Sequence, residues 1–451
     1  MSPLPRAFSA VSRRLQSALG RSYRSCGTGR MYVSFRTSLN RDTTPSISEE
    51  NIARYASGGF HPVRIGTKFD NGKYRVLRKL GFGVYSTVWL AHNTQTKQMV
   101  ALKILTADTY DGKKDSYELA ILDCIVNKQK AHQEQQEKRG DPQSKHVLGL
   151  LDTFRHEGPN GQHVCFVFKA MGPNLGQLRD LFPRRRLPVH LAKQVARDLV
   201  TALAFLHDEC GVIHTGVSHT SSKVYREKCA RNTAETNDMF QHAPPDVFQQ
   251  KSAPLPPPHD YYMASEPVAS AHEDLTAAAA VSGMSFRLAD FGTASWTTKL
   301  LSEWIQPDKL RAPEVILGAA WDSKVDIWNL GLVIWELTTG QLCFDGQATA
   351  TAAYSSEAHL AQMQAILGRV PDTLLSRASR RDRLESGISF PSLALENLCA
   401  GSGAFGEGDG RKDDREAFVA FVRSMLDLEP HNRPCARDLL ESSWLRTTTI
   451  E

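Results

Sequence analysis

The segment GFGVYS, residues 81–86, has the composition of a loop that binds phosphate. It lies between two stretches expected to be strands, 75–80 and 87–91, and glycines at 81 and 83 would let the backbone approach phosphate oxygens. Lys103, in VALKIL farther along, is placed to reach the α- and β-phosphates of a nucleotide, and Glu118 could pair with its amine and hold it in place. A glycine pair alone is a weak indication, but the order of these residues predicts a nucleotide site.

A carboxylate much later in the chain could add magnesium to this site. The sequence RLADFGTASW ends an apolar stretch with Asp290, and an aspartate there can coordinate the magnesium ion that bridges nucleotide phosphates. Three segments follow in order, namely RAPEVILG with Glu314, DSKVDIWNLGLVIWEL with Asp326, and LEPHNRPCARDLL with Arg433.

Two sets of elements must position these residues. From about residue 60 to 171, apolar and polar residues alternate around Gly, Asn and Pro turn signals, which predicts five mostly antiparallel strands and one helix near 115–127. A polar stretch, 127–145, is expected to connect them. This first part would form a strand-rich small lobe.

The pattern then becomes helical. In LAKQVARDLVTALAFLH one apolar face is formed by Leu191, Val195, Leu199, Leu203 and Leu206. Further helices are expected at about 324–339, 357–367, 416–427 and 435–441. Two segments, 226–284 and 400–414, are interpreted as largely unstructured surface insertions. A strand-rich lobe before a helix-rich lobe predicts an α+β, two-lobe fold.

This ordered series resembles the eukaryotic protein kinase family over about residues 68–447. More narrowly it is similar to the SR-protein kinases, which phosphorylate Ser in Arg-Ser repeats. The narrower resemblance rests on KLGFGVYSTVWLA, with Ser86 in place of a third Gly, on HVCFVFKAMGPNL, and on VIHT, where Thr215 stands at a position that is Arg in most kinases. It also rests on a short activation segment, from Asp290 to Glu314. The missing Arg fits a family that needs no activation-loop phosphorylation.

The resemblance implies a bilobal kinase fold, with a small lobe at about 68–171, a large lobe at about 172–447, and ATP and Mg²⁺ as cofactors. It implies catalytic roles for Lys103, Glu118 and Asp290, with Asp290 as the metal ligand, and a structural ion pair between Glu314 and Arg433. The nucleotide contacts that it implies are Leu80, Gly81, Phe82, Gly83, Val84, Tyr85, Ser86, Thr87, Val88, Ala101, Lys103, the gatekeeper Phe168, and the backbone of Lys169, Ala170 and Met171. A Glu is usual in place of Lys169, but adenine is recognised there by backbone groups, so we expect little effect.

The catalytic loop departs from the family. GVIHTGVSHTSSKV, residues 211–224, lies where the family has the pattern HTD-x-K-x-x-N, and ungapped alignment puts Gly216 at the catalytic Asp, Ser218 at the Lys and Ser221 at the Asn. No Asp or Glu occurs between Glu209 and Glu227, so a short shift in alignment supplies no carboxylate. Loss of a positioned general base typically costs a factor of about 10²–10⁴ in rate, roughly 3–5 kcal/mol.

Two neighbouring features bear on this loss. His219 is a conceivable substitute base near neutral pH, although its position normally points elsewhere. The segment SSKVYREKC replaces the usual Ile-Leu run after the Asn, so the strand there is expected to be weak and the wall beneath adenine altered.

Three hypotheses remain open from the sequence. The first is an ATP-binding pseudokinase. The second is an active or weakly active serine/threonine kinase that transfers the γ-phosphate of ATP to Arg/Ser-rich proteins. The third is a decaying duplicate without function.

The composition limits the other partners. Residues 1–48 contain eight Arg and one Asp, a charge of +7, so the remaining chain carries −2 of the total +5 and gives no reason to expect nucleic acid. No apolar run approaches the roughly 18 residues that span a bilayer. The eight cysteines are scattered singly, which suits a reducing compartment. We expect a monomer.

The N-terminal arm, residues 1–58, is basic. Its first thirty residues contain no acid and have apolar residues at helical spacing opposite arginines, which is typical of a mitochondrial presequence; a disordered basic tail is the alternative. A mitochondrial location would conflict with the SR-protein kinase resemblance, which implies the cytoplasm and nucleus.

Overall fold

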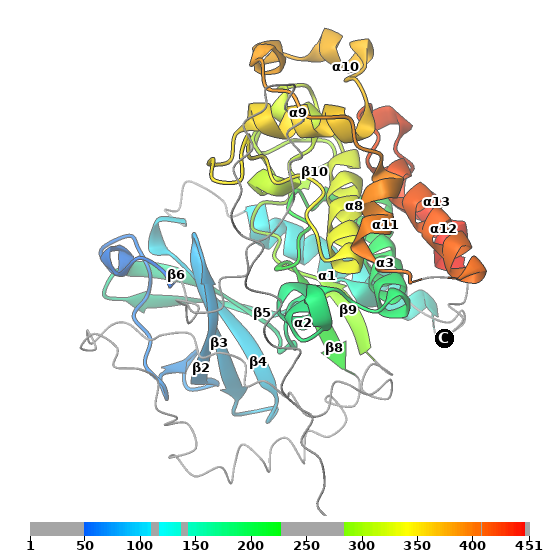
Figure 1. Ribbon diagram of the computed structural model, residues 1–451. Coiled ribbons are helices and arrows are strands. Elements are labelled where there is room, and N and C mark those ends of the chain that lie inside the picture. Colours follow the sequence, from blue (N-terminus) through cyan, green and yellow to red (C-terminus); the bar gives the residue numbers. More distant parts are fainter. Residues whose placement is uncertain (1–48, 110–116, 137–142, 227–283, 407, 447–451) are drawn as a thin grey trace, which may run out of the picture. The chain divides into compact units, whose positions relative to one another are not determined.

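The computed structural model describes residues 49–109, 117–136, 143–226, 284–406 and 408–446 (Figure 1). The predicted arm up to residue 48 and nearly all of the predicted insertion 226–284 lie outside these ranges. Residues 49–58, at the end of the predicted arm, are described and contact the small lobe. There Glu50 pairs with the buried amine of Lys79.

The small lobe contains one antiparallel sheet with the strand order β1-β2-β3-β4-β6-β5. Its strands are β1 (Lys68–Phe69), β2 (Tyr74–Gly83), β3 (Ser86–Asn93), β4 (Met99–Leu105), β5 (Leu150–Gly158) and β6 (Gly161–Lys169). The sixth strand corrects the predicted count of five. It is the two-residue β1, which pairs with the start of β2 and is too short to show an alternating pattern.

One long helix accompanies this sheet, α1 (Tyr117–Gln136). The prediction placed its end near 127 and a polar connection after it. The helix continues for about two more turns because the Gln- and Lys-rich sequence there consists of good helix formers, even though it has no apolar stripe.

The large lobe is mostly helical, so the predicted α+β, two-lobe fold is confirmed (Figure 1). Its helices are α2 (Leu175–Asp180), α3 (Val189–Ala204), α7 (Pro313–Ile316), α8 (Lys324–Thr339), α9 (Ser356–Leu367), α10 (Asp372–Arg377), α11 (Leu395–Ser402), α12 (Asp409–Met425), α13 (Ala436–Leu439) and α14 (Ser443–Arg446). The predicted apolar face of α3, including Leu206 in the π-helical turn that follows, is fully buried.

Two short two-stranded sheets accompany these helices. β7 (Val212–Ile213) pairs with β10 (Ser295–Trp296), and β8 (Ser222–Arg226) pairs with β9 (Met284–Leu288). The expectation of a weak strand in SSKVYREKC was wrong, because antiparallel pairing with β9 holds all five residues of β8 in register. Backbone hydrogen bonds do not need the usual Ile-Leu side chains.

The segment 400–414 is also more ordered than predicted. Helix α11 extends to Ser402, and α12 begins at Asp409. The composition rich in Gly and Asp belongs to the end of one helix and the exposed start of the next, where these residue types are favoured.

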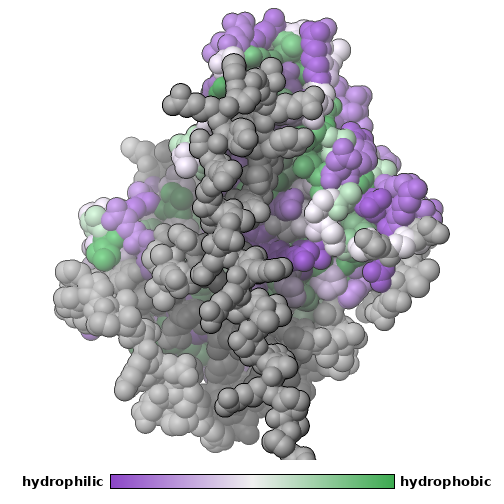
Figure 2. Space-filling view, viewed as in Figure 1, coloured by the Kyte–Doolittle hydropathy of each residue, from purple (hydrophilic) through white to green (hydrophobic). Residues whose placement is uncertain are grey.

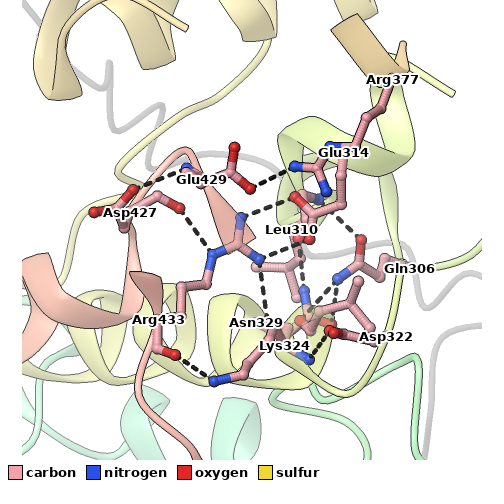
Figure 3. Close-up of polar contacts among 12 residues, drawn as sticks. Gln306, Leu310, Glu314, Asp322, Lys324, Asn329, Arg377, Asp427, Glu429 and Arg433 are labelled. Atoms are coloured by element: carbon pink, nitrogen blue, oxygen red, sulfur yellow. Dashed lines mark hydrogen bonds and ion pairs between the residues drawn. The ribbon is translucent and has the colours of Figure 1, made fainter. Parts of the chain in front are cut away.

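A buried ion pair links distant parts of the large lobe, as the resemblance implied. The guanidinium of Arg433 donates to both carboxylate oxygens of Glu314, at 2.7 and 2.8 Å, and both side chains are fully buried (Figure 3). Arg433 also donates to the carbonyl of Asp427 at 2.8 Å. The pair fixes α7 against the segment before α13.

In the view of Figure 2, hydrophilic and hydrophobic residues are interspersed over the helical part of the surface. Among the described residues, no helix is both long enough and apolar enough to cross a membrane.

Candidate nucleotide site

Three residues predicted from distant segments meet at one amine. Lys103 on β4 donates to Glu118 in the first turn of α1, with 2.6 Å between Nζ and Oε1, and its Nζ lies 3.4 Å from Oδ1 of Asp290, just after β9. Lys103 and Glu118 are almost buried, whereas the Asp290 side chain is 67% exposed. The structure therefore assembles the predicted set, and it leaves the aspartate open to a ligand.

The electrostatics of this group follow from its charges. Burial disfavours the charged amine, but the carboxylates of Glu118 and Asp290 outweigh burial, so the pKa of Lys103 is raised. In turn the Lys103 ammonium lowers the pKa of Asp290. At neutral pH the site thus presents an ammonium and an ionised carboxylate side by side, as phosphate and magnesium binding require.

The glycine-rich segment forms the hairpin between β2 and β3. Gly83 pairs with Ser86, so Val84 and Tyr85 form the turn, and both are exposed. A Cβ added at Gly81 would meet no atom within 4 Å, and one at Gly83 would meet only Ser86, at 3.6 Å. The space beside this backbone is therefore open, as the approach of a phosphate group needs.

The predicted adenine contacts lie where β4 and β6 pair. Ala101 is opposite Phe168, and Lys169 ends β6, with Ala170 and Met171 following. All five residues are partly exposed, as expected for the rim of a cleft.

Two of the predicted contacts are buried, Ser86 with 7% and Thr87 with 0% of its surface exposed. The Thr87 hydroxyl accepts a hydrogen bond of 3.0 Å from Nε1 of Trp89. The Thr87 side chain therefore contributes to packing inside the small lobe rather than to the cleft.

The backbone frame of the catalytic loop is intact. The buried carboxylate of Asp326 accepts from the amides of His214 and Thr215, at 2.7 and 2.8 Å, and from Nε2 of His207 at 2.9 Å. Thr215 has a φ of 63°, which is rare for a β-branched residue, and its hydroxyl donates to the carbonyl of Thr293 at 2.6 Å. The backbone amides of His214 and Thr215 and the hydroxyl of Thr215 thus hold the loop. Neither residue is among the three that differ from the family pattern.

Two of the three serines in this loop, Ser218 and Ser221, bond to each other. The amide of Ser218 donates to Oγ of Ser221 at 2.9 Å, and that hydroxyl donates to the carbonyl of Ser218 at 3.1 Å. Both side chains are buried. The Ser221 hydroxyl, at the metal-binding Asn position, is therefore engaged within the loop, so Asp290 is the residue that fits magnesium here, and Ser221 does not.

Gly216 leaves room for the Cβ of the Asp that the family pattern has, with one close contact. A Cβ at this position would lie 3.3 Å from Oγ1 of Thr293, a close but adjustable contact with a side chain, and its next neighbours are at 3.8 Å or more.

His219, the conceivable substitute base, faces away from the site. It lies beside α2 and α8, with its Nε2 3.6 Å from Glu336, and burial lowers its pKa to about 4. A group with so low a pKa is a poor base at neutral pH, so the structure does not support that role.

Two residues near the site, Arg54 and Lys223, were not predicted as site residues. Arg54 donates to the carbonyl of Val84 at the tip of the glycine hairpin, and its guanidinium lies 6.0 Å from the Tyr85 ring centroid. Lys223, on β8, is the second residue after the Asn position. The sequence signal for Lys223 was its occurrence inside the run that is usually apolar; Arg54 carried no signal.

A comparison with known protein families identifies the domain. The family model described as "Protein kinase domain" matches residues 74–217 and 272–445. Ser218 and Ser221 lie in the unmatched part between these ranges.

The chain is also similar to named kinases. It is 30% identical to "Serine/threonine-protein kinase SRPK" of Physarum polycephalum, over 88% of this chain and 91% of that protein. It is 31% identical to "Protein kinase dsk1" of Schizosaccharomyces pombe, over 88% and 85%. It is 23% identical to "SRSF protein kinase 3" of Homo sapiens, over 88% and 90%.

Proposed function

Because this chain belongs to the protein kinase family, among the SRPK-like serine/threonine kinases, we propose that it binds ATP at the site described above and acts as a pseudokinase. One observation carries the proposal. Lys103, Glu118 and Asp290 are assembled, while the neighbouring loop has Gly216, Ser218 and Ser221 at the three positions that direct phosphoryl transfer.

Each remaining group has a defined part in nucleotide binding. The backbone beside Gly81 and Gly83 is open to phosphate oxygens, Lys103 is oriented by Glu118 toward the α- and β-phosphates, and Asp290 would hold magnesium against them. ATP supplies the γ-phosphoryl group in kinases of this family. Backbone groups after Phe168 would contact the adenine.

The loss of the catalytic Asp limits the reaction that can follow. Without a carboxylate near Gly216, no residue of the pattern accepts the proton of a substrate hydroxyl or orients that hydroxyl. A kinase turnover of about 1–100 s⁻¹ would fall by about 10²–10⁴ for this group alone. The changes at Ser218 and Ser221 affect the same transition state, so their effects need not add to it.

Binding is tested by calorimetric titration of the full chain with Mg-ATP. We expect measurable affinity that falls at least about tenfold in Lys103→Met, because the phosphate-binding ammonium is removed. Far-UV circular dichroism controls for folding of the variant. Absence of binding in the wild-type chain would overturn the proposal in favour of a decaying duplicate.

Transfer is tested separately with radiolabelled ATP and an Arg-Ser repeat peptide. We expect incorporation near background for the wild-type chain. Transfer at an ordinary kinase rate that disappears in Lys103→Met would show an active kinase instead.

A second candidate function is a weakly active serine/threonine kinase for Arg/Ser-rich proteins. The assembled contacts among Lys103, Glu118 and Asp290 favour it, since positioning and metal-ion charge contribute to phosphoryl transfer without a base. One relative is named as a kinase of SRSF proteins, which supports this substrate class.

The location of the protein remains a prediction. The acid-free start of the basic arm, residues 1–30, is proposed as a mitochondrial presequence, with the cytoplasm and nucleus, which the kinase resemblance implies, as the alternative. A fusion of this arm to a fluorescent protein distinguishes them: mitochondrial fluorescence supports the presequence, and diffuse fluorescence contradicts it.

A further inference from the structure

Lys223 lies on a strand next to the proposed nucleotide site. It is on β8, directly opposite Arg287 on β9, and on its other side it forms an antiparallel bridge with Asn174, three residues after Met171. Just before β8 begins, the carbonyl of Ser221 accepts a hydrogen bond of 2.8 Å from the amide of Ala289. Asp290 is the residue after Ala289. Lys223 is therefore placed between the segment that would hold adenine and the carboxylate that would hold magnesium.

The amine of Lys223 lacks a counter-ion at contact distance. Among the described residues it makes no hydrogen bond and no ion pair, and its side chain is partly exposed. Burial lowers the pKa of Lys223, while the negative charge of Asp290 opposes this change, so the two groups interact through the cleft. A partly buried ammonium without a counter-ion is less favourable than a paired one, and an anionic ligand would pair with it.

The formal charges of the site change accordingly. In the family pattern, the catalytic-loop Asp and Lys cancel, and Lys103, Glu118 and Asp290 leave a total of −1. Here the loop has neither charge, and Lys223 raises the total to 0. A site with a total charge of 0 repels a nucleotide without bound metal less than a site with a total of −1. The difference comes from Lys223, which stands at a position that is usually apolar.

We propose that Lys223 binds a phosphate group of the nucleotide across the cleft from Lys103, so that the nucleotide binds without needing a divalent cation. The four methylene groups of the side chain would still give adenine an apolar floor, because a lysine stem packs as a hydrophobic surface while its amine reaches a polar partner. The hydroxyl of Ser221 also supports this proposal. It is hydrogen-bonded within the loop, so magnesium would have one oxygen ligand fewer.

This inference rests on the proposed nucleotide binding and is tested by calorimetry with ATP in excess EDTA and in excess Mg²⁺. For the wild-type chain we expect dissociation constants within about threefold of each other. Lys223→Leu, which restores an apolar floor, should bind ATP about tenfold more weakly in EDTA and be less affected in Mg²⁺, because the loss of one charge-assisted contact is then partly replaced by the metal.

Two controls separate phosphate binding from packing. Adenosine carries no phosphate, so Lys223→Leu should bind it as tightly as the wild-type chain does. Lys309→Leu removes an exposed lysine on the large lobe and should leave every affinity unchanged.

The outcomes are distinguishable. Equal affinity of Lys223→Leu and wild type for ATP in EDTA overturns the role of Lys223, and so does a wild-type chain that binds ATP only with Mg²⁺; both leave the proposed function standing. A wild-type chain that binds ATP under neither condition overturns the proposed function itself.

Discussion

The two sides of the cleft are maintained by different kinds of contact. On the nucleotide side, functional side chains hold one another, because Lys103 contacts both Glu118 and Asp290. In the catalytic loop, the buried Asp326 holds the backbone amides of His214 and Thr215, and the serines at two of the catalytic positions bond to the loop's own backbone. Loss of the reactive groups can therefore leave the loop folded, whereas loss of any nucleotide-side group would disturb its partners.

The largest effect is expected from restoring the catalytic Asp in the loop. Gly216→Asp should raise phosphate transfer to an Arg-Ser peptide by about 10²–10⁴, since the position is open except for Thr293 and the frame is in place. The measurement is initial rate at saturating Mg-ATP. The matched control is the same substitution in the Lys103→Met background, which should remain inactive.

If Gly216→Asp gives no gain, the triple variant with Ser218→Lys and Ser221→Asn decides the reason. Recovery only in the triple variant would show that the serine network also blocks transfer. If neither the single nor the triple variant recovers transfer, the loop backbone held by Asp326 does not place these side chains for catalysis.

The frame itself depends on one carboxylate. Asp326→Ala should lower the free energy of unfolding by about 3–5 kcal/mol, because it leaves two buried amides and His207 without their acceptor. Urea unfolding followed by circular dichroism measures this loss. The exposed Asp382→Ala should change stability by less than about 0.5 kcal/mol; similar effects of the two variants would contradict the proposed frame.

Acid should weaken the small lobe through buried histidines. Burial, followed by the charges of His156 and His163, lowers the pKa of His61 to about 3 from an ordinary value of 6.5. Below pH 6.5 the unfolded chain binds a proton that the folded chain does not, so stability is complete above 6.5 and declines as pH falls toward 3. At pH 5 this single group should cost about 2 kcal/mol.

Substitution separates this histidine from the other groups that titrate. His61→Phe should flatten the dependence of unfolding free energy on pH between 7 and 5, although repacking beside Gly158 will lower stability at every pH. His190→Phe, at an exposed position, should keep the wild-type slope. An unchanged slope in His61→Phe would contradict the assignment.

The smallest effect is expected at the hairpin tip. Arg54→Ala removes the contact with the carbonyl of Val84 and the partly exposed pair with Asp108, together worth less than about 1 kcal/mol. We expect faster amide hydrogen exchange in residues 80–87 and a change in ATP affinity of less than about threefold. Lys97→Ala, at a distant turn, serves as the control; equal exchange in both variants would show that residues 49–58 do not steady the hairpin.

Much of the molecule was predictable from residue order. Strand patterns in the sequence located the turn glycines, the lysine in VALKIL and the aspartate in LADFG. Helical spacing predicted the apolar face of α3. Predictions were wrong where composition misled, as at the end of α1 and in 400–414, and where strand formation depends on a distant partner, as for β8 with β9.

The sequence by itself determined which chemical groups are present, including the absence of a carboxylate between Glu209 and Glu227, because chemistry depends on residue type. Only the tertiary structure decided how those groups are used. It bonded Ser218 to Ser221, directed His219 away from the cleft and placed Lys223 between Asn174 and Asp290, since hydrogen-bond partners, burial and strand register arise from segments that are far apart in the chain.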